Sequence, residues 1–226
     1  MKLIVKNLKK SFGEKEVLKD IDYIFDKGFI YSVIGRNGTG KTTLFNCISF
    51  QEKIDAGEIL VDANGKVRPI SHDDVYLVSA APVLPEFLTG YEFIRAFVEF
   101  NKVKAFDIDE LFERFNFEDA DKHRLIKEYS FGMKNKIQMM CAFIKKPLII
   151  LLDEPLSSLD IIVSHDIKEM MIAMKDDHII IMSTHIVQLA TDVSDEVAIL
   201  KDGLLNKCRN DFNSPIEFEK YLMEVI

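Results

Sequence analysis

Residues 35–42 form a glycine-rich loop of the kind that can bind a chain of phosphate groups. They read GRNGTGKT and match the pattern GxxxxGK[ST] at every specified position. Glycines let the backbone adopt positive φ angles and bring its N–H groups close to phosphate oxygens. Lys41 would reach the β- and γ-phosphates, and the Thr42 hydroxyl would bind Mg²⁺. The predicted nucleotide contacts are Gly35, Arg36, Asn37, Gly38, Thr39, Gly40, Lys41, Thr42 and Thr43.

The segments on either side of this loop are those that the motif requires. Residues 29–34 (FIYSVI) are a continuous apolar run of strand length, which is typical of a strand buried on both faces. Residues 41–50 indicate a helix, whose N-terminus would point its partial positive charge at the same phosphates. The alternative, a glycine turn with an incidental lysine, requires neither element. The sequence therefore favours a nucleotide site.

Two adjacent acidic residues follow a second apolar strand. Residues 148–152 (LIILL) end in Asp153, Glu154 and Pro155. Beside a phosphate loop on a neighbouring strand, Asp153 would hold Mg²⁺ directly or through water. Glu154 would polarise an attacking water as a general base. Both could instead be solvated turn residues, but the phosphate loop makes that the weaker interpretation.

Five motifs occur in one order along most of the chain, and together they resemble those of the nucleotide-binding subunit of ABC transporters. They are the phosphate loop (Walker A), YSFGM at 129–133 (signature), DEP at 153–155 (Walker B), SLD at 158–160 (D-loop) and His185 (switch histidine). The YSxGM form of the signature is similar to that of the branch whose subunits serve exporters of drugs, peptides or bacteriocins. The resemblance implies an ATPase with ATP and Mg²⁺ as its cofactors.

The resemblance also gives the signature residues a role. Ser130, Gly132 and Met133 would stand where a helix over 133–144 begins, and a helix N-terminus attracts anions. In the family this end contacts the γ-phosphate held by the phosphate loop of another subunit. The resemblance thus implies a homodimer or heterodimer of ATPase subunits with two shared sites. Without it, Ser130 would be an ordinary helix N-cap.

Three further residues take their roles from the resemblance alone. His185 would contact the γ-phosphate and help position Glu154, so that the catalytic set is Glu154, His185 and Lys41. Asp160 is similar to the D-loop acid that crosses the dimer interface. Phe12 stands where the family has an aromatic residue that stacks on adenine. As one of 17 phenylalanines, it could otherwise belong to the core.

Two positions depart from the family pattern. Members usually have a glutamine, which touches Mg²⁺ and senses the membrane partner, after the strand that ends near Val78. This chain has Ala80 there, which leaves metal coordination and coupling at that position open. Phe131 replaces the first glycine of the signature, at a position that varies in the YSxGM branch. We expect its side chain to point away from phosphate.

The remaining pattern predicts an α/β fold of the P-loop NTPase, ABC type. Strands alternate with helices in the last third of the chain, which favours a mostly parallel sheet. Short strands are predicted at 3–5 and 17–23, and the resemblance implies an N-terminal antiparallel β subdomain. In the middle of the chain, apolar residues such as Phe93, Phe97 and Phe100 recur at helical spacing. We predict a single ABC ATPase domain over 1–226, with a nucleotide-binding core at 1–79 and 146–226 and an inserted α-helical subdomain at 80–145.

Composition narrows the classes of partner. The 226 residues have a formal net charge of −8, and an acidic surface repels phosphodiester backbones, so we expect no nucleic-acid partner. No apolar run approaches the roughly 20 residues that span a bilayer, and the N-terminus lacks the features of a secretion signal. We expect a cytoplasmic protein, peripheral on the inner face of the cell membrane, that powers export through a separate transmembrane permease subunit. Two alternatives stay open: a soluble ABC-type ATPase, for instance in cluster assembly, and a regulatory subunit that binds nucleotide without hydrolysing it.

Overall fold

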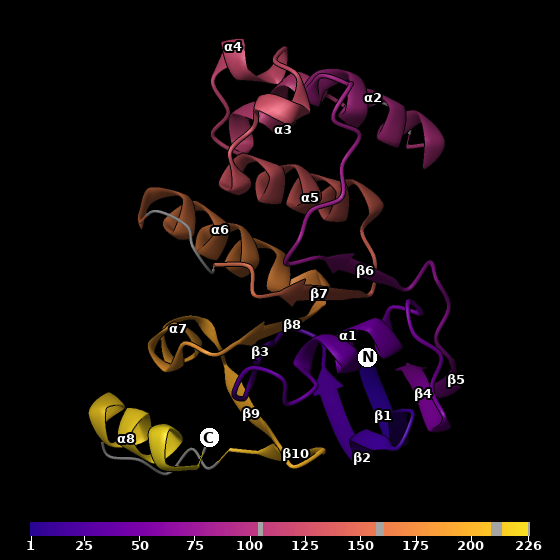
Figure 1. The fold of residues 1–226 in the computed structure, drawn as a ribbon. Coiled ribbons are helices and arrows are strands. Elements are labelled where there is room, and N and C mark those ends of the chain that lie inside the picture. Colours follow the sequence, from indigo (N-terminus) through magenta and orange to yellow (C-terminus); the bar gives the residue numbers. More distant parts are fainter. Residues whose placement is uncertain (104–105, 157–160, 209–213, 226) are drawn as a thin grey trace.

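Two β-sheets and a group of helices make up the computed structural model (Figure 1). It describes residues 1–103, 106–156, 161–208 and 214–225, and only the backbone of residues 161–163 and 215. The strands are β1 (Lys2–Phe12), β2 (Lys15–Asp26), β3 (Ile30–Ile34), β4 (Ala56–Ala63), β5 (Lys66–Pro69), β6 (Val75–Val78), β7 (Ile149–Asp153), β8 (Ile179–Thr184), β9 (Glu196–Lys201) and β10 (Leu204–Lys207). The helices are α1 (Lys41–Ile48), α2 (Gly90–Phe100), α3 (Ile108–Arg114), α4 (Asp119–Lys122), α5 (Phe131–Lys145), α6 (Ile161–Met174), α7 (Val187–Val193) and α8 (Pro215–Val225), with 3-10 turns η1 (Ile126–Glu128) and η2 (Lys175–Asp177).

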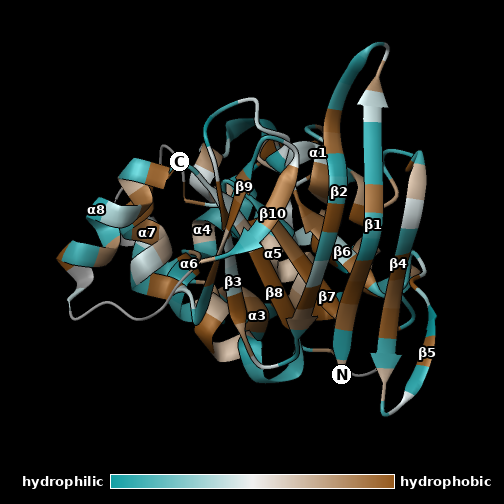
Figure 2. Ribbon diagram, turned by 90° about the horizontal axis from the view of Figure 1, so that it is seen from below, coloured by the Kyte–Doolittle hydropathy of each residue, from teal (hydrophilic) through white to brown (hydrophobic). Residues whose placement is uncertain are grey.

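The larger sheet is mostly parallel, as the alternation of strands and helices predicts. Its order is β10-β9-β3-β8-β7-β6, and only β10 runs antiparallel to its neighbour. Every residue of β3, β7 and β8 is buried. Figure 2 shows β7 and β8 as largely brown, apolar strands, whereas β1, β2 and β4 mix teal and brown. A parallel strand covered on both faces needs such a continuous apolar run.

Helices cover both faces of this sheet, and alternate residues of one strand pack against different layers. Ile149 and Leu151 of β7 share an apolar cluster with Phe45 of α1 and with the inner face of β1. Ile150 and Leu152 belong to a second cluster, built with α5 and α6. Because side chains alternate across a strand, one strand joins the two layers.

The strand order brings the carboxyl ends of three strands together. In register, Ile34 of β3 lies beside Thr184 of β8, and Ser183 of β8 lies beside Asp153 of β7. Ligands of open α/β sheets bind at the carboxyl ends of the strands. The phosphate loop, the acidic pair and the segment that leads to His185 therefore leave the sheet at one edge.

The smaller sheet is antiparallel, as expected, but more extensive than predicted. Its order is β2-β1-β4-β5. The predicted strand at 3–5 is near the start of β1, which has 11 residues, and the predicted strand at 17–23 lies within β2, which has 12. The strands β4 and β5 of this sheet, and β10 at the edge of the larger sheet, were not predicted. The strands β5 and β10 have only four residues each. Along most of β1 and β2, charged and apolar residues alternate, because only one face of this sheet is covered. A search for apolar runs therefore underestimates them.

The helices α2 to α5 lie on the far side of β6 and β7 from α1 (Figure 1). A capping box starts α2: Thr89 Oγ1 accepts from the Glu92 N–H, and the Glu92 carboxylate accepts from the Thr89 N–H. Phe93 and Phe97 pack against the core, but Phe100 is 84% exposed. Within the described ranges, no helix combines the length and apolarity needed to cross a membrane.

The fold makes a pH-dependent contribution to stability at His178, just before β8. This side chain is buried, and its Nδ1–H donates to the carbonyl of Pro147 at 2.5 Å. Burial lowers the pKa of His178 below its ordinary value of 6.5. The unfolded chain therefore takes up this proton at a higher pH than the folded chain. The free energy of unfolding contributed here is present above about pH 6.5 and falls as the pH drops toward the folded pKa.

Replacing His178→Asn removes this titration. We expect the variant to be less stable at pH 7, but its free energy of unfolding should fall less steeply between pH 7 and 5, by up to about 1.4 kcal/mol per pH unit. Urea unfolding of both proteins at several pH values measures the two slopes. Equal slopes would show that His178 takes up its proton at the same pH in the folded and unfolded chain.

Candidate nucleotide-binding site

The phosphate loop turns sharply between β3 and α1. Two of its positions require glycine, each for a different structural reason. Gly40, the N-cap of α1, has φ 110°, and a Cβ there would lie 2.9 Å from Val17 Cγ1. Gly35 has no positive φ, but a Cβ on it would lie 2.6 Å from the Leu200 carbonyl oxygen. From the sequence, we expected these glycines to allow positive φ angles and a close approach of the backbone to phosphate. At Gly35 the reason is close packing against β9.

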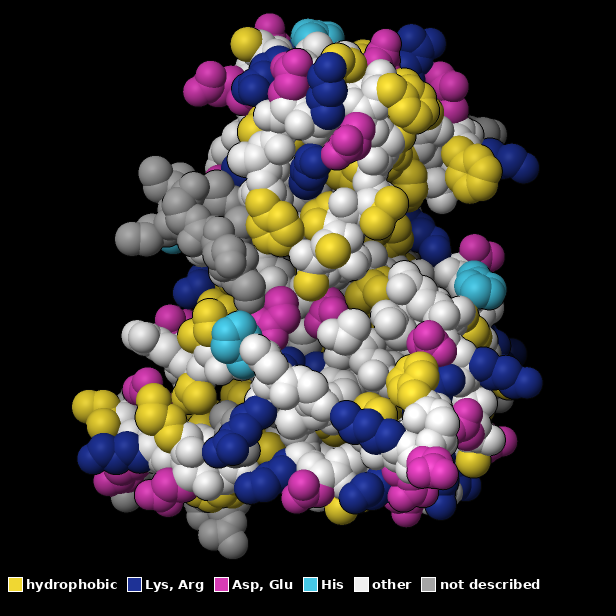
Figure 3. All heavy atoms as spheres, in the orientation of Figure 1, with side chains coloured by type: hydrophobic (Ala, Val, Ile, Leu, Met, Phe, Trp, Pro, Cys, Tyr) yellow, Lys and Arg dark blue, Asp and Glu magenta, His cyan; other side chains and the backbone are white. Residues whose placement is uncertain are grey.

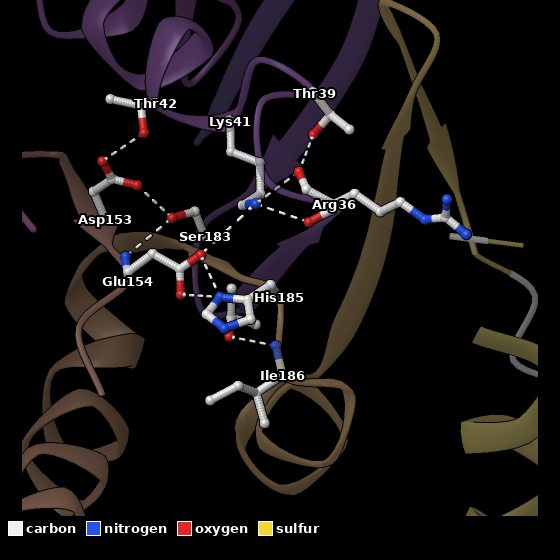
Figure 4. A network of polar contacts seen from close by, with 11 residues as sticks. Arg36, Thr39, Lys41, Thr42, Asp153, Glu154, Ser183, His185 and Ile186 are labelled. Carbon is white, nitrogen blue, oxygen red and sulfur yellow. Dashed lines mark hydrogen bonds and ion pairs between the residues drawn. The ribbon is translucent and has the colours of Figure 1, made fainter. Parts of the chain in front are cut away.

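Lys41 holds the loop in this curled form (Figure 4). Its side chain is 6% exposed, and its ammonium donates to the carbonyls of Gly35 at 2.8 Å and Arg36 at 3.3 Å. The ammonium also lies 3.7 Å from the Glu154 carboxylate. A buried cation needs such partners to offset its lost hydration. The predicted phosphate ligand and the predicted general base are thus neighbours.

Two side chains, those of Thr42 and Ser183, fix the carboxylate of Asp153, which is 5% exposed. Thr42 Oγ1 donates to Asp153 Oδ2 at 2.9 Å, and Ser183 Oγ donates to Oδ1 at 2.5 Å. The same Ser183 oxygen accepts from the Glu154 backbone N–H at 3.0 Å. Ser183 therefore joins the two acidic residues. We did not predict it from the sequence, where the only signal is one polar residue at the end of an apolar strand.

The donor set at Thr42 and Asp153 fits Mg²⁺. Both predicted ligands present oxygens, within 2.9 Å of one another. Mg²⁺ is usually bound through one or two carboxylates, with substrate phosphates and water completing its shell. Within the described ranges, no group of three or more His, Cys, Asp or Glu side chains forms a self-sufficient metal site. This pair therefore suits a metal that arrives with a phosphate ligand.

Glu154 lies where the strand β7 ends, and its backbone adopts an unusual conformation. Its φ of 49° is in the left-handed region, which costs a residue with a side chain about 1–3 kcal/mol. The bond to Ser183 helps to hold this turn. The carboxylate then faces His185, whose Nδ1 lies 3.0 Å from both of its oxygens (Figure 4). The structure thus brings together Glu154, His185 and Lys41, the predicted catalytic set.

A cavity of about 450 Å³ opens beside the phosphate loop. Phe12, at the end of β1, lies at this cavity with 47% of its surface exposed. The Lys10 ammonium lies 4.8 Å from the centre of its ring. An exposed ring beside a phosphate site can stack on a nucleotide base, which agrees with the role expected for Phe12. The lining residues are Phe12, Lys15, Val17, Asn37, Gly38, Gly40, Lys41, Thr42, Thr43 and Glu154.

Other predicted site residues lie apart from this cavity. Ser130 caps α5, its Oγ accepting from the Met133 N–H at 3.2 Å, but neither these residues nor Gly132 line the cavity. The Arg36 side chain points away from the loop (Figure 4) toward a second cavity beside α7 and α8. Asp160 lies outside the described residues.

The comparisons with known proteins agree with this geometry. A family model described as ABC transporter matches residues 18–157, more than half of the chain. The chain belongs to the ABC transporter family. This chain, called the cassette below, is 28% identical to the lantibiotic transport ATP-binding protein SrtF of Streptococcus pyogenes, over 96% of this chain and 99% of that protein. It is 30% identical to the phosphonates import ATP-binding protein PhnC of Fusobacterium nucleatum subsp. nucleatum, over 88% of each chain.

A solved structure of the ATP-binding subunit of an ABC transporter has the same fold. It matches the cassette with a TM-score of 0.82 and 26% sequence identity, over 99% of this chain and 100% of that one. The predicted family and fold class are therefore confirmed, and ATP is the nucleotide that this ABC ATPase domain binds and hydrolyses.

Removing the Ser183 hydroxyl tests how the acidic pair of the cassette is held. In Ser183→Ala, one Asp153 oxygen and the Glu154 N–H lose their buried partner, at a cost of about 1–3 kcal/mol for each group. We expect the ATPase kcat to fall about tenfold and the Mg²⁺ concentration for half-maximal rate to rise. Ser183→Thr should restore both, and Ser49→Ala at the end of α1 is a matched control. An unchanged Mg²⁺ dependence in Ser183→Ala would contradict this role.

Proposed function

We propose that this chain is the Mg-ATP-hydrolysing subunit of an exporter, and that it works as one of a pair of ATPase subunits on a separate transmembrane permease. The observation that carries the hydrolytic part is the position of Glu154, beside Lys41 and His185 and one residue after Asp153. In this proposal the subunit is cytoplasmic and binds peripherally at the inner face of the membrane.

The proposed mechanism assigns one task to each side chain. Lys41 and the N-terminus of α1 bind the β- and γ-phosphates and offset charge that spreads in the transition state. Thr42 and Asp153 would hold Mg²⁺, which neutralises phosphate charge when bound. Glu154 accepts a proton from the attacking water, and His185 holds the Glu154 carboxylate in place.

The second anion site supports a pair of subunits. The N-terminus of α5, with Ser130, Gly132 and Met133, does not line the cavity that contains Lys41. A helix end of this kind stabilises an anion, so we propose that it meets the γ-phosphate held by a second ATPase subunit. Each nucleotide would then be held by both subunits, which links ATP binding to pairing.

Exposed apolar residues support a docking face for the permease. Val83 is 95% and Phe87 is 79% exposed, on the segment between β6 and α2. Figure 3 shows apolar side chains gathered on this face of the helical part. Apolar side chains exposed together mark an interaction surface. The similarity to SrtF along nearly its whole length, together with YSFGM, supports export, although the relatives also include an importer subunit.

Replacing Glu154→Gln tests the catalytic assignment. The amide keeps the size of the side chain but cannot accept the proton, so we expect hydrolysis to fall at least a hundredfold while ATP remains bound. The variant should then form a stable pair with ATP, which light scattering after size-exclusion chromatography detects. Glu58→Gln, on the exposed face of β4, is the matched control. A variant that stays monomeric with ATP and hydrolyses at the parental rate would show that Glu154 is not the base.

Replacing Phe87→Asp tests the docking face. A charge on this exposed ring position disfavours burial against an apolar partner. We expect the fraction of the protein that sediments with membranes of the native cell to fall at least fivefold. Val67→Asp, on the exposed edge strand β5, is the control and should sediment like the parent. If the parent itself is recovered only in the supernatant, the soluble-ATPase alternative is favoured instead.

A further inference from the structure

Gln138, in the middle of α5, binds the backbone just beyond the end of β6. Its Oε1 accepts from the Ser79 N–H at 3.0 Å, and its Nε2 donates to the Ser79 carbonyl at 3.3 Å. The side chain is 6% exposed and stands in an otherwise apolar stretch, between Ile137 and Met139. A buried amide is costly unless it is hydrogen bonded. The two hydrogen bonds to Ser79 therefore explain an amide at this position, because a leucine or methionine could fill similar space but could not form them.

The two ends of this link belong to different parts of the ATPase machinery. Ser79 directly follows Val78, which pairs with Leu152, the residue before Asp153. Gln138 is on the helix that Ser130 caps, roughly 12 Å along its axis, since each residue rises about 1.5 Å. The link thus connects the strand end beside the acidic pair to the second anion site.

Other contacts hold α5 elsewhere. At its C-terminal end, the Lys145 ammonium donates to the carbonyls of His72 and Val75. Lys136 pairs with Asp166 of α6 at 2.7 Å. Lys134 reaches Glu86 on the segment before α2, but that carboxylate is 65% exposed, so solvent weakens the pair. Gln138 makes a buried hydrogen-bonded contact between the helix and the start of this segment.

We propose that Gln138 is a positioning residue that fixes the Ser130 end of α5 relative to Asp153 and Glu154. Ala80, which follows Ser79, has no side-chain donor or acceptor and cannot make such a link. The amide of Gln138 on α5 makes it instead, through hydrogen bonds to the backbone of Ser79. This inference rests on the proposed function in one respect: the helix end that Gln138 positions is the one that meets the ATP held by a second ATPase subunit.

The test uses the full chain with Gln138→Leu, which keeps the volume and removes both hydrogen bonds. Spin labels on Lys66→Cys in β5 and Glu118→Cys at the start of α4 report the distance between the small sheet and the helical part. The native cysteines are buried, so the labels select the introduced ones. We expect one narrow distance distribution in the parent and a distribution at least twice as broad in the variant. In Lys145→Met, which removes different hydrogen bonds of the same helix, the distance distribution should stay as narrow as in the parent.

A second readout separates positioning from general loss of structure. In Gln138→Leu, we expect the ATPase kcat to fall about tenfold while KM for ATP changes less than twofold, because the phosphate loop is intact. Gln138→Glu, which keeps the acceptor, should recover part of kcat. Equal distance distributions and equal kcat in parent and variant would overturn the inference.

Hydrogen exchange decides the matter if Gln138→Leu does not fold. In the parent, we expect the Ser79 amide to be protected as strongly as those of β6, and free exchange there would overturn the inference. The label distances and hydrogen exchange are measured on single chains and do not depend on pairing. If Glu154→Gln fails to pair with ATP, the proposed function is wrong, whereas a narrow label distance in Gln138→Leu counts against the positioning role alone.

Discussion

The structure depends on one buried ammonium group. Lys41 is almost fully enclosed and binds two carbonyls of its own loop and the carboxylate of Glu154. A cation in such a place is stable only if oxygens surround it. The loop must therefore curl, and β3 and β7, which are not neighbours but flank β8, must end at the same edge of the sheet. The phosphate oxygens of ATP can also accept hydrogen bonds from this ammonium, so the same side chain that holds the loop can bind the nucleotide.

The sheet transmits this constraint to the rest of the molecule. Because β7 lies between β6 and β8, Ser183 holds Asp153 on one side, and on the other side β6 pairs with Leu152, the residue before it. Alternate residues of β7 are buried against α1 on one face of the sheet and against α5 and α6 on the other. A change in how α5 packs would therefore act on the strand that ends at the two acidic residues. This continuity is a physical basis for coupling nucleotide chemistry to the helical face that we propose meets the permease.

The sequence predicted those parts whose chemistry is local. The phosphate loop, the buried strands and the helix that begins at Ser130 follow from residue type and spacing along the chain, and the described positions of Lys41, Thr42, Asp153 and Glu154 agree with them. His185 was predicted from the resemblance alone, and the structure places it beside Glu154. Ser183 and Gln138 could not be predicted, because their partners are 30 and 59 residues away in sequence. The long strands β1 and β2 were underestimated, since a sheet with one covered face needs no continuous apolar run.

A crystal structure with Mg²⁺ and a non-hydrolysable ATP analogue would show directly whether Lys41 holds the phosphates. We expect the β- and γ-phosphates to lie against the N–H groups of residues 38–42, with the Lys41 ammonium within hydrogen-bond distance of their oxygens. We also expect the metal to touch Thr42 and to face Asp153. Phosphates bound elsewhere, or a Lys41 side chain that makes no contact with them, would show that this lysine does not organise the nucleotide site.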